Sequence, residues 1–110
     1  MKRMEFEVQG SAAEPYKVIF ELDGSNMNAF CNCPAGSKGQ YCKHRFGIMR
    51  GETKGIVSIN SADAEIIPSW LPGTDVEEAL SQLAEAEHEL AKIKKRVSAA
   101  KKGIAQAMRA

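Results

Sequence analysis

The chain has 110 residues, 44% of them hydrophobic, and its 15 Lys and Arg side chains nearly balance 14 Asp and Glu, for a net charge of +1. This length allows one small domain with an appendage rather than two full domains, and the near-neutral balance lacks the strong basic footprint of a dedicated DNA-binding protein. The odd number of cysteines, three, argues against a disulfide framework, and no stretch is apolar enough to span a membrane. Because the start also has no apolar leader, we expect a soluble, cytoplasmic protein of a reducing compartment, with no membrane partner.

The first thirty residues predict three short strands. Met4–Gln9 alternates apolar and polar residues and is typical of an edge strand. Tyr16–Leu22 and Met27–Phe30 predict a hairpin, because Asp23–Asn26 between them consists of the turn residues Asp, Gly, Ser and Asn. This hairpin would deliver the residues that follow it to its open end.

Soft metal ligands gather directly after the hairpin, in Cys31-Asn32-Cys33 and in Cys42-Lys43-His44. Cys thiolates and a neutral imidazole satisfy a tetrahedral zinc ion, so these four ligands predict a closed, structural Cys3His site for Zn²⁺. Three unconnected thiols would leave their clustering unexplained. A redox pair of Cys31 and Cys33 is a further alternative, but so small a loop is strained and leaves Cys42 without a role.

The residues around the ligands predict the rest of a zinc knuckle. Pro34–Gly39 is a loop by composition, with two glycines able to bend back over a metal. Lys43–Met49 predicts a short helix that ends at Gly51. The hairpin, the ligand loop and this helix make a ββα zinc knuckle, and therefore an α+β fold with a small antiparallel sheet.

This part of the chain resembles the SWIM zinc finger, in which a C-x-C pair, a short variable loop and a C-x-H pair follow a β-hairpin. The family's four ligand positions correspond here to Cys31, Cys33, Cys42 and His44. Pro34 and Lys43 also suit the pattern, whereas Gly47 departs from it, which implies a shorter helix. The resemblance covers about residues 15–50 and implies a module that binds zinc and contacts DNA or a protein.

The segment from Gly51 to Gly73 is mostly irregular. Gly55–Ile59 predicts a short strand that joins the sheet, and prolines frame Glu65–Pro72, which suits neither a helix nor a central strand. Trp70 would then cover the core of the head together with Ile67. The alternative is that Trp70 is an exposed aromatic anchor for a partner.

The C-terminal third predicts one long helix. Thr74-Asp75-Val76-Glu77 is a capping box with Thr74 as the N-cap, and good helix formers continue to about Met108, roughly 50 Å further on. Apolar residues repeat every seven positions, which is typical of a coiled coil. One seam position is occupied by Val76, Leu83, Leu90, Val97 and Ile104, and the other by Ala79, Ala86, Ile93, Ala100 and Ala107.

Acidic side chains occupy the first half of this helix and basic side chains the second half. The arrangement suits the helix dipole by itself, but it would also let two copies pair antiparallel. We therefore expect a homodimer held by Val76, Leu83, Leu90, Ile93, Val97 and Ile104. The alternative is that the stripe folds back onto the chain's own head. The sequence thus predicts a zinc-binding head, residues 1–73, and a helical dimerisation segment, residues 74–110.

Two functions remain open for such a two-headed module. Basic side chains on and around the knuckle could contact DNA or RNA: Lys38, Lys43, Arg45, Arg50 and Lys54. Alternatively, the protein is an adaptor or inhibitor that docks on a protein of a nucleic-acid-handling machine, with no direct nucleic-acid contact, as an accessory factor of a phage or mobile element would. Catalysis is not expected, because four protein ligands fill the zinc shell and no Glu stands beside them as a base.

Overall fold

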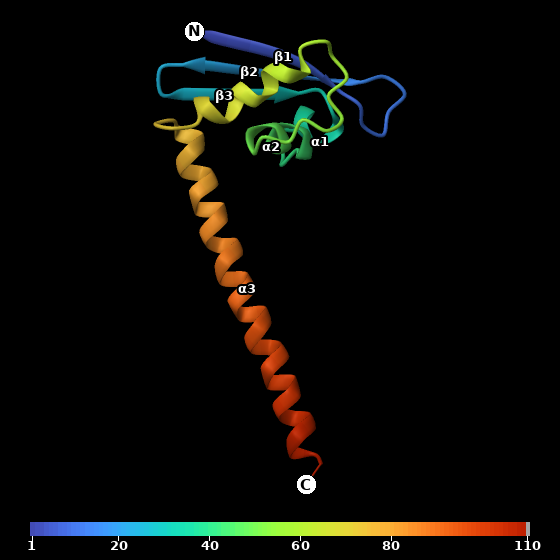
Figure 1. Ribbon diagram of the computed structural model, residues 1–110, viewed down its shortest axis with the longest axis vertical. Coiled ribbons are helices and arrows are strands. Elements are labelled where there is room, and N and C mark those ends of the chain that lie inside the picture. Colours follow the sequence, from blue (N-terminus) through green and yellow to red (C-terminus); the bar gives the residue numbers. More distant parts are fainter. Residues whose placement is uncertain (110) are drawn as a thin grey trace. The chain divides into compact units, whose positions relative to one another are not determined.

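The computed structural model describes residues 1–109, which contain both a β-sheet and helices (Figure 1). The chain divides into two compact units, Met1–Glu77 and the residues from Glu78 onward. The first unit contains strands β1 (Lys2–Val8), β2 (Tyr16–Asp23) and β3 (Asn26–Cys31), helices α1 (Pro34–Ser37) and α2 (Lys43–Met49), and the 3-10 helix η1 (Ser61–Trp70). The long helix α3 (Asp75–Ala107) begins in the first unit and makes up the second.

The three strands form one antiparallel sheet in the order β1-β2-β3. The predicted hairpin is confirmed: Asp23 faces Asn26 across the turn, where Gly24 has a φ of 61° that other residues rarely adopt. The predicted edge strand is also confirmed, with Phe6 opposite Val18. Because side chains alternate along a strand, one face of the sheet is apolar and buried and the other carries polar side chains.

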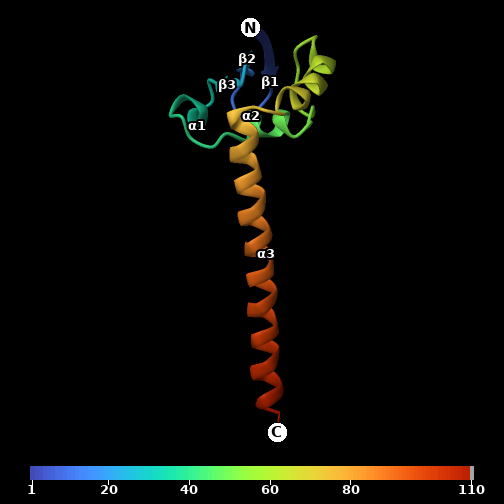
Figure 2. The same ribbon diagram turned by 90° about the vertical axis from the view of Figure 1, so that its left-hand side faces the viewer.

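The core lies on the apolar face of this sheet. Phe6 and Phe20 meet edge to face there, with ring centroids 6.3 Å apart. The helix α2 contributes Ile48 and Met49, and the 3-10 helix η1, which contacts α2, contributes the buried Ala64, Ile67 and Trp70. Figure 2 shows η1 in yellow beside the strands. Trp70 is only 5% exposed, so its predicted core position is confirmed and the alternative of an exposed anchor is wrong.

The predicted strand Gly55–Ile59 is wrong. It forms a single bridge, between Val8 and Ile56, and Gly55 has a φ of 91°, which interrupts an extended chain. Hydrogen bonds from side chains take the place of a backbone ladder along the edge of β1. Ser58 Oγ accepts the Glu7 N–H at 3.1 Å, and Asn60 Nδ2 donates to the Glu5 carbonyl at 2.8 Å. The edge of β1 is therefore covered without a fourth strand.

Two other segments are more helical than expected. The 3-10 helix η1 includes most of Glu65–Pro72, with Pro68 inside it. The fixed φ of proline suits a 3-10 helix, and the Pro68 carbonyl accepts the Leu71 N–H at 3.3 Å. The expected loop after the second cysteine contains the single turn α1, in which Pro34 occupies a first-turn position that needs no N–H donor.

The long helix begins at the predicted capping box. The Thr74 hydroxyl accepts the Glu77 N–H at 3.3 Å, and the Glu77 carboxylate accepts the Gly73 N–H at 3.2 Å. Asp75 then joins the helix to the hairpin, because its N–H donates to the Ser25 carbonyl at 3.2 Å. The helix α3 runs for 33 residues, and none of them is buried. Within residues 1–109, no helix combines the length and apolarity that crossing a membrane requires.

Candidate metal centre

The four predicted ligands converge from three elements of the first unit. Cys31 ends β3, Cys33 is the N-cap of α1, Cys42 is the N-cap of α2, and His44 lies in the first turn of α2. Their ligand atoms all lie within 4.8 Å of one another, and the three cysteines are free thiols. The hairpin therefore delivers one pair of ligands and the start of α2 delivers the other, as the sequence predicted.

The distances between the ligand atoms fit a tetrahedral zinc ion. Cys33 Sγ lies 3.4 Å from Cys42 Sγ, and His44 Nδ1 lies 3.7 Å from Cys31 Sγ and 3.6 Å from Cys42 Sγ. Zinc–ligand bonds of roughly 2.0–2.3 Å at tetrahedral angles require ligand separations of about 3.5–3.8 Å. Three thiols and one imidazole are also the donor set of structural zinc sites. The residues present therefore fit Zn²⁺ as the cofactor, held by Nδ1 of the histidine.

Backbone contacts fix the two ligands of the first pair. Between them, Asn32 continues the pairing with β2: its side-chain oxygen accepts the Lys17 N–H at 2.8 Å, and its own N–H donates to the Lys17 carbonyl at 3.2 Å. The Gly36 N–H donates to Cys33 Sγ at 3.2 Å, which fixes the position of this sulfur. Gly36 packs so closely on Cys31 that a Cβ at this position would collide with the Cys31 carbonyl.

The imidazole of His44 is packed on its other side as well. The Tyr16 ring lies 5.1 Å from it, centroid to centroid, and a Cβ on Gly10 would come within 3.3 Å of His44 Nε2. This nitrogen is buried and has no hydrogen-bond partner among the residues that the structure describes. The packing thus orients Nδ1 toward the thiols and shields Nε2 from solvent.

The protonation of the cluster suits a cation. Burial raises the pKa of the Cys31 thiol to about 12, and the neighbouring Cys33 and Cys42 thiols add to this increase. Burial also acts to raise the pKa of Cys42, but hydrogen bonds from the Arg45 backbone and from neighbouring thiols outweigh it, and the net pKa is lowered. Burial, with the charge of Lys43, lowers the pKa of His44, so its imidazole is neutral at pH 7 and ready to ligate. With its raised pKa, Cys31 is a neutral thiol at pH 7 without a metal, and a bound cation would compensate the charge of three thiolates this close together.

Residues 16–48 match the family model of the SWIM zinc finger. The match spans the hairpin, both ligand pairs and nearly all of α2, and it includes the four clustered ligands. The head of this protein therefore carries a SWIM zinc finger, which is a zinc-binding module. No curated protein and no solved structure matches the chain.

The five basic residues predicted as a binding surface are spread over the SWIM zinc finger and its surroundings. Lys38, Lys43, Arg50 and Lys54 are exposed. Arg45 is half-buried instead, and its guanidinium donates to the Ala29 carbonyl at 3.0 Å and to the Gln40 carbonyl at 2.6 Å. Two of its nitrogens thus join β3 to the ligand loop, a contact that sequence reasoning missed.

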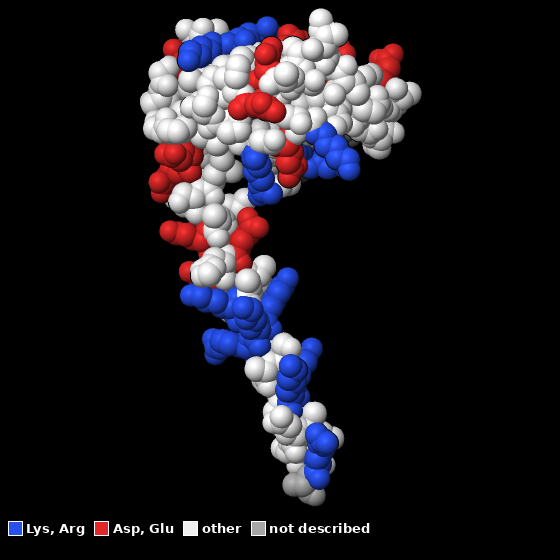
Figure 3. Space-filling view, in the orientation of Figure 1, with Lys and Arg blue, Asp and Glu red and all other residues white. Residues whose placement is uncertain are grey.

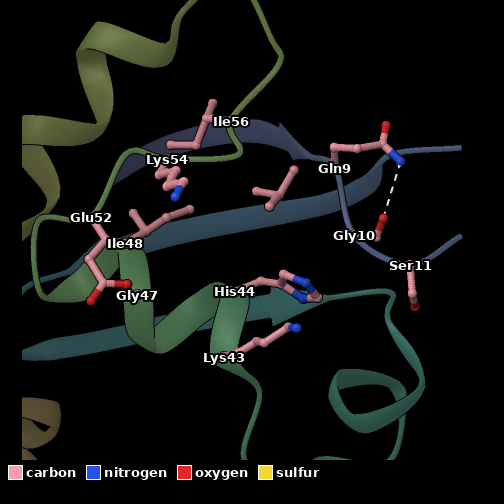
Figure 4. Close-up of a pocket in the computed structure, with 11 residues that line it drawn as sticks. Gln9, Gly10, Ser11, Lys43, His44, Gly47, Ile48, Glu52, Lys54 and Ile56 are labelled. Atoms are coloured by element: carbon pink, nitrogen blue, oxygen red, sulfur yellow. Dashed lines mark hydrogen bonds between the residues drawn. The ribbon is translucent and has the colours of Figure 1, made fainter.

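Two of these cations line one cavity beside the metal ligand His44. Lys43 and Lys54 line one cavity of about 400 Å³ together with His44, and Figure 4 shows both side chains at this cavity, from α2 and from the segment after it. Glu52 also lines it, near Gly47, so the cavity keeps an excess of one positive charge. The sequence spacing of Lys43 and Lys54 does not by itself predict that both line this cavity, because the path of residues 50–56 brings Lys54 to it.

Aromatic side chains of the SWIM zinc finger divide between the core and the surface. Tyr41 and Phe46 stack on each other with centroids 4.2 Å apart, and Tyr41 remains 59% exposed. Phe30 is 52% exposed on the polar face of the sheet, where it faces Ile19 of β2. Sequence reasoning did not single out Phe30; its place out of phase with the buried Met27 and Cys31 was the available signal.

Proposed function

We propose that this protein is a non-catalytic, dimeric interaction module whose SWIM zinc finger contacts the phosphate backbone of DNA or RNA. The observation that carries the proposal is that Lys43 and Lys54 line one cavity together with the zinc ligand His44. Phosphate contacts by exposed lysines supply most of the sequence-independent affinity for nucleic acids. Lys38 precedes α2 and Arg50 follows it along the chain, and both are exposed.

The two segments of the chain have different roles. Residues 1–73 act as the head, in which zinc holds the hairpin and α2 together, and the residues from 74 onward act as the dimerisation segment. The role of zinc is structural, because three thiolates and one imidazole complete its shell and leave no position for a reacting water. Buried free thiols that must stay reduced for the metal suit an intracellular, reducing compartment.

The experiment is a titration of the zinc-loaded protein into fluorescently labelled duplex and single-stranded DNA and RNA, followed by anisotropy. We expect binding that weakens steeply between low and physiological salt, and that falls further in Lys43→Glu and Lys54→Glu variants. Lys2→Glu, an exposed residue of β1 that does not line this cavity, is the matched control. Arg45 is left unchanged, because its replacement would remove two contacts of the fold.

A protein partner is the second candidate, and a different surface favours it. Phe30 and Ile19 line a cavity of about 640 Å³ at the edge strand β3, beside Lys17 and Arg45. An exposed aromatic residue with a basic rim suits docking of an acidic protein surface. No nucleic-acid binding even at low salt, together with a partner complex lost in Phe30→Ala but not in Lys43→Glu, would establish this function instead.

A further inference from the structure

The helix α3 carries an apolar stripe that is open to solvent. Leu90, Ile93 and Val97 are each about half exposed, Ile104 is more so, and no residue of the helix is buried. Most of the stability of a protein helix comes from packing its apolar face, since propensity alone barely sustains an isolated helix. This stripe therefore requires a partner surface of matching length.

We propose that the partner is α3 of a second copy, antiparallel, with the two-fold axis between Ala91 and Lys92. The inference rests on the self-association in the proposed function and is independent of nucleic-acid binding. About this axis, every seam residue of one helix faces a seam residue of the other. The central layers pair Leu90 with the partner's Ile93.

Side-chain volumes support this register. On either side of the centre, each layer sets one large residue against one alanine. Val76 faces the partner's Ala107, Ala79 the partner's Ile104, Leu83 the partner's Ala100, and Ala86 the partner's Val97. Alternating large and small residues fill the space between two helices evenly. In a parallel pair, each seam residue would instead face its own copy. Four layers would then contain only alanine, and the layers of large residues between them would keep the two helices too far apart for these alanines to touch, which leaves cavities.

Charges support the same register. Figure 3 shows acidic side chains over the first half of α3 and basic side chains over the second half. In the antiparallel pair, the seam is flanked by Glu89 opposite the partner's Arg96 and by Glu87 opposite the partner's Lys94, each twice by symmetry. In a parallel pair, Glu89 would still meet an opposite charge, the partner's Lys94, but Arg96 would meet the partner's Lys101, a repulsive contact. The antiparallel arrangement places the starts of the two helices at opposite ends, roughly 50 Å apart.

The test is sedimentation equilibrium of the zinc-loaded full chain without nucleic acid, for the wild type and three variants. We expect a wild-type dimer. Arg96→Glu sets Glu89 against a like charge in both symmetric contacts, so the dimer dissociation constant should rise about 10-fold or more. The double variant Glu89→Arg/Arg96→Glu should restore dimerisation. Lys95→Glu makes the same charge change on the outer face of the helix and should leave the dissociation constant within about 2-fold of wild type.

Three results would overturn the proposal. A zinc-loaded wild type that stays monomeric at high micromolar concentration would exclude self-association. Tighter association of Arg96→Glu would indicate parallel helices, because the new Glu would then meet the partner's Lys101. An oligomer larger than a dimer would exclude the two-helix register. None of these results depends on nucleic-acid binding, so the nucleic-acid contact in the proposed function is tested separately.

Discussion

The carboxylate of Asp75 accepts the backbone N–H of Met27 at 3.2 Å, which joins the first turn of α3 to the outer edge of β3. The same oxygen accepts the Val76 N–H at 3.0 Å, so one side chain satisfies donors of both the strand and the helix. A second contact, from the Asp75 N–H to the Ser25 carbonyl, ends at the turn of the hairpin. The start of the long helix is thereby built into the head.

Replacing Asp75 with alanine should destabilise this junction. The Met27 and Val76 N–H groups would lose their charged acceptor, at a cost of about 1–3 kcal/mol in the free energy of unfolding. Chemical denaturation followed by Trp70 fluorescence measures the change. Asp75→Asn keeps an oxygen acceptor without the charge and should lose less. Equal stability of Asp75→Ala and wild type would show that water replaces the contact at no cost.

Removal of the zinc, or replacement of Cys42 with serine, should unfold the head. In isolated fingers, structural zinc contributes an apparent ~10–16 kcal/mol, which is comparable to the whole stability of a small domain. We expect one zinc per chain in the wild type and a large loss of zinc and of ¹H–¹⁵N NMR dispersion in Cys42→Ser. His88→Ala, a second histidine that is exposed on α3, is the control and should keep the full zinc content. A dispersed spectrum of the zinc-free protein would contradict a structural role for the metal.

Zinc affinity should fall as the pH decreases. Burial and Lys43 lower the pKa of His44 below its ordinary 6.5, so the folded head resists protonation. The stability that this group contributes is present above pH 6.5 and is lost as the pH falls through the lowered value. Acid also competes directly with zinc for the imidazole and the thiolates, in the same direction.

The measurement is competition with a chelator between pH 5 and 8. Once the pH falls below the lowered pKa of His44, the logarithm of the zinc affinity should steepen by about one additional unit per pH unit, because binding then displaces a proton from His44 as well. In a His44→Cys variant, which keeps four ligands, this additional steepening should be absent. A wild-type profile with the same slope throughout would exclude His44 as a ligand that titrates in this range.

Gly36→Ala should weaken the zinc site without touching a ligand side chain. The added Cβ would collide with the Cys31 carbonyl and crowd its Cβ, and neither atom is the end of a flexible side chain. We expect a loss of about 1–3 kcal/mol in stability, through displacement of the Cys31 and Cys33 backbone, and a lower zinc affinity. Lys38→Ala, an exposed change at the end of α1, should alter neither property by more than about 0.5 kcal/mol. Unchanged zinc affinity in Gly36→Ala would show that α1 can move away from β3.

Local patterns determined most of the elements of this protein. The hairpin, the edge strand, α2 and the start of α3 follow from alternation, turn residues and a capping box, all of which act within a few residues. The zinc ligands were equally readable, because Cys and His in two close pairs have few other uses. The apolar repeat of α3 also belongs to the sequence, since it depends only on the period of a helix.

Longer-range packing decided the remainder. The segment after α2 has enough β-branched residues for a strand, but Gly55 and the side chains of Ser58 and Asn60 give it a different way to cover the edge of β1. Sequence reasoning placed Arg45 on a binding surface, yet its guanidinium donates to two backbone carbonyls, and that of Ala29 is 16 residues away in the chain. Lys43 and Lys54 meet at one cavity only because the chain turns back after α2. Such contacts join residues far apart in sequence, and they depend on how the core folds the chain rather than on any local preference.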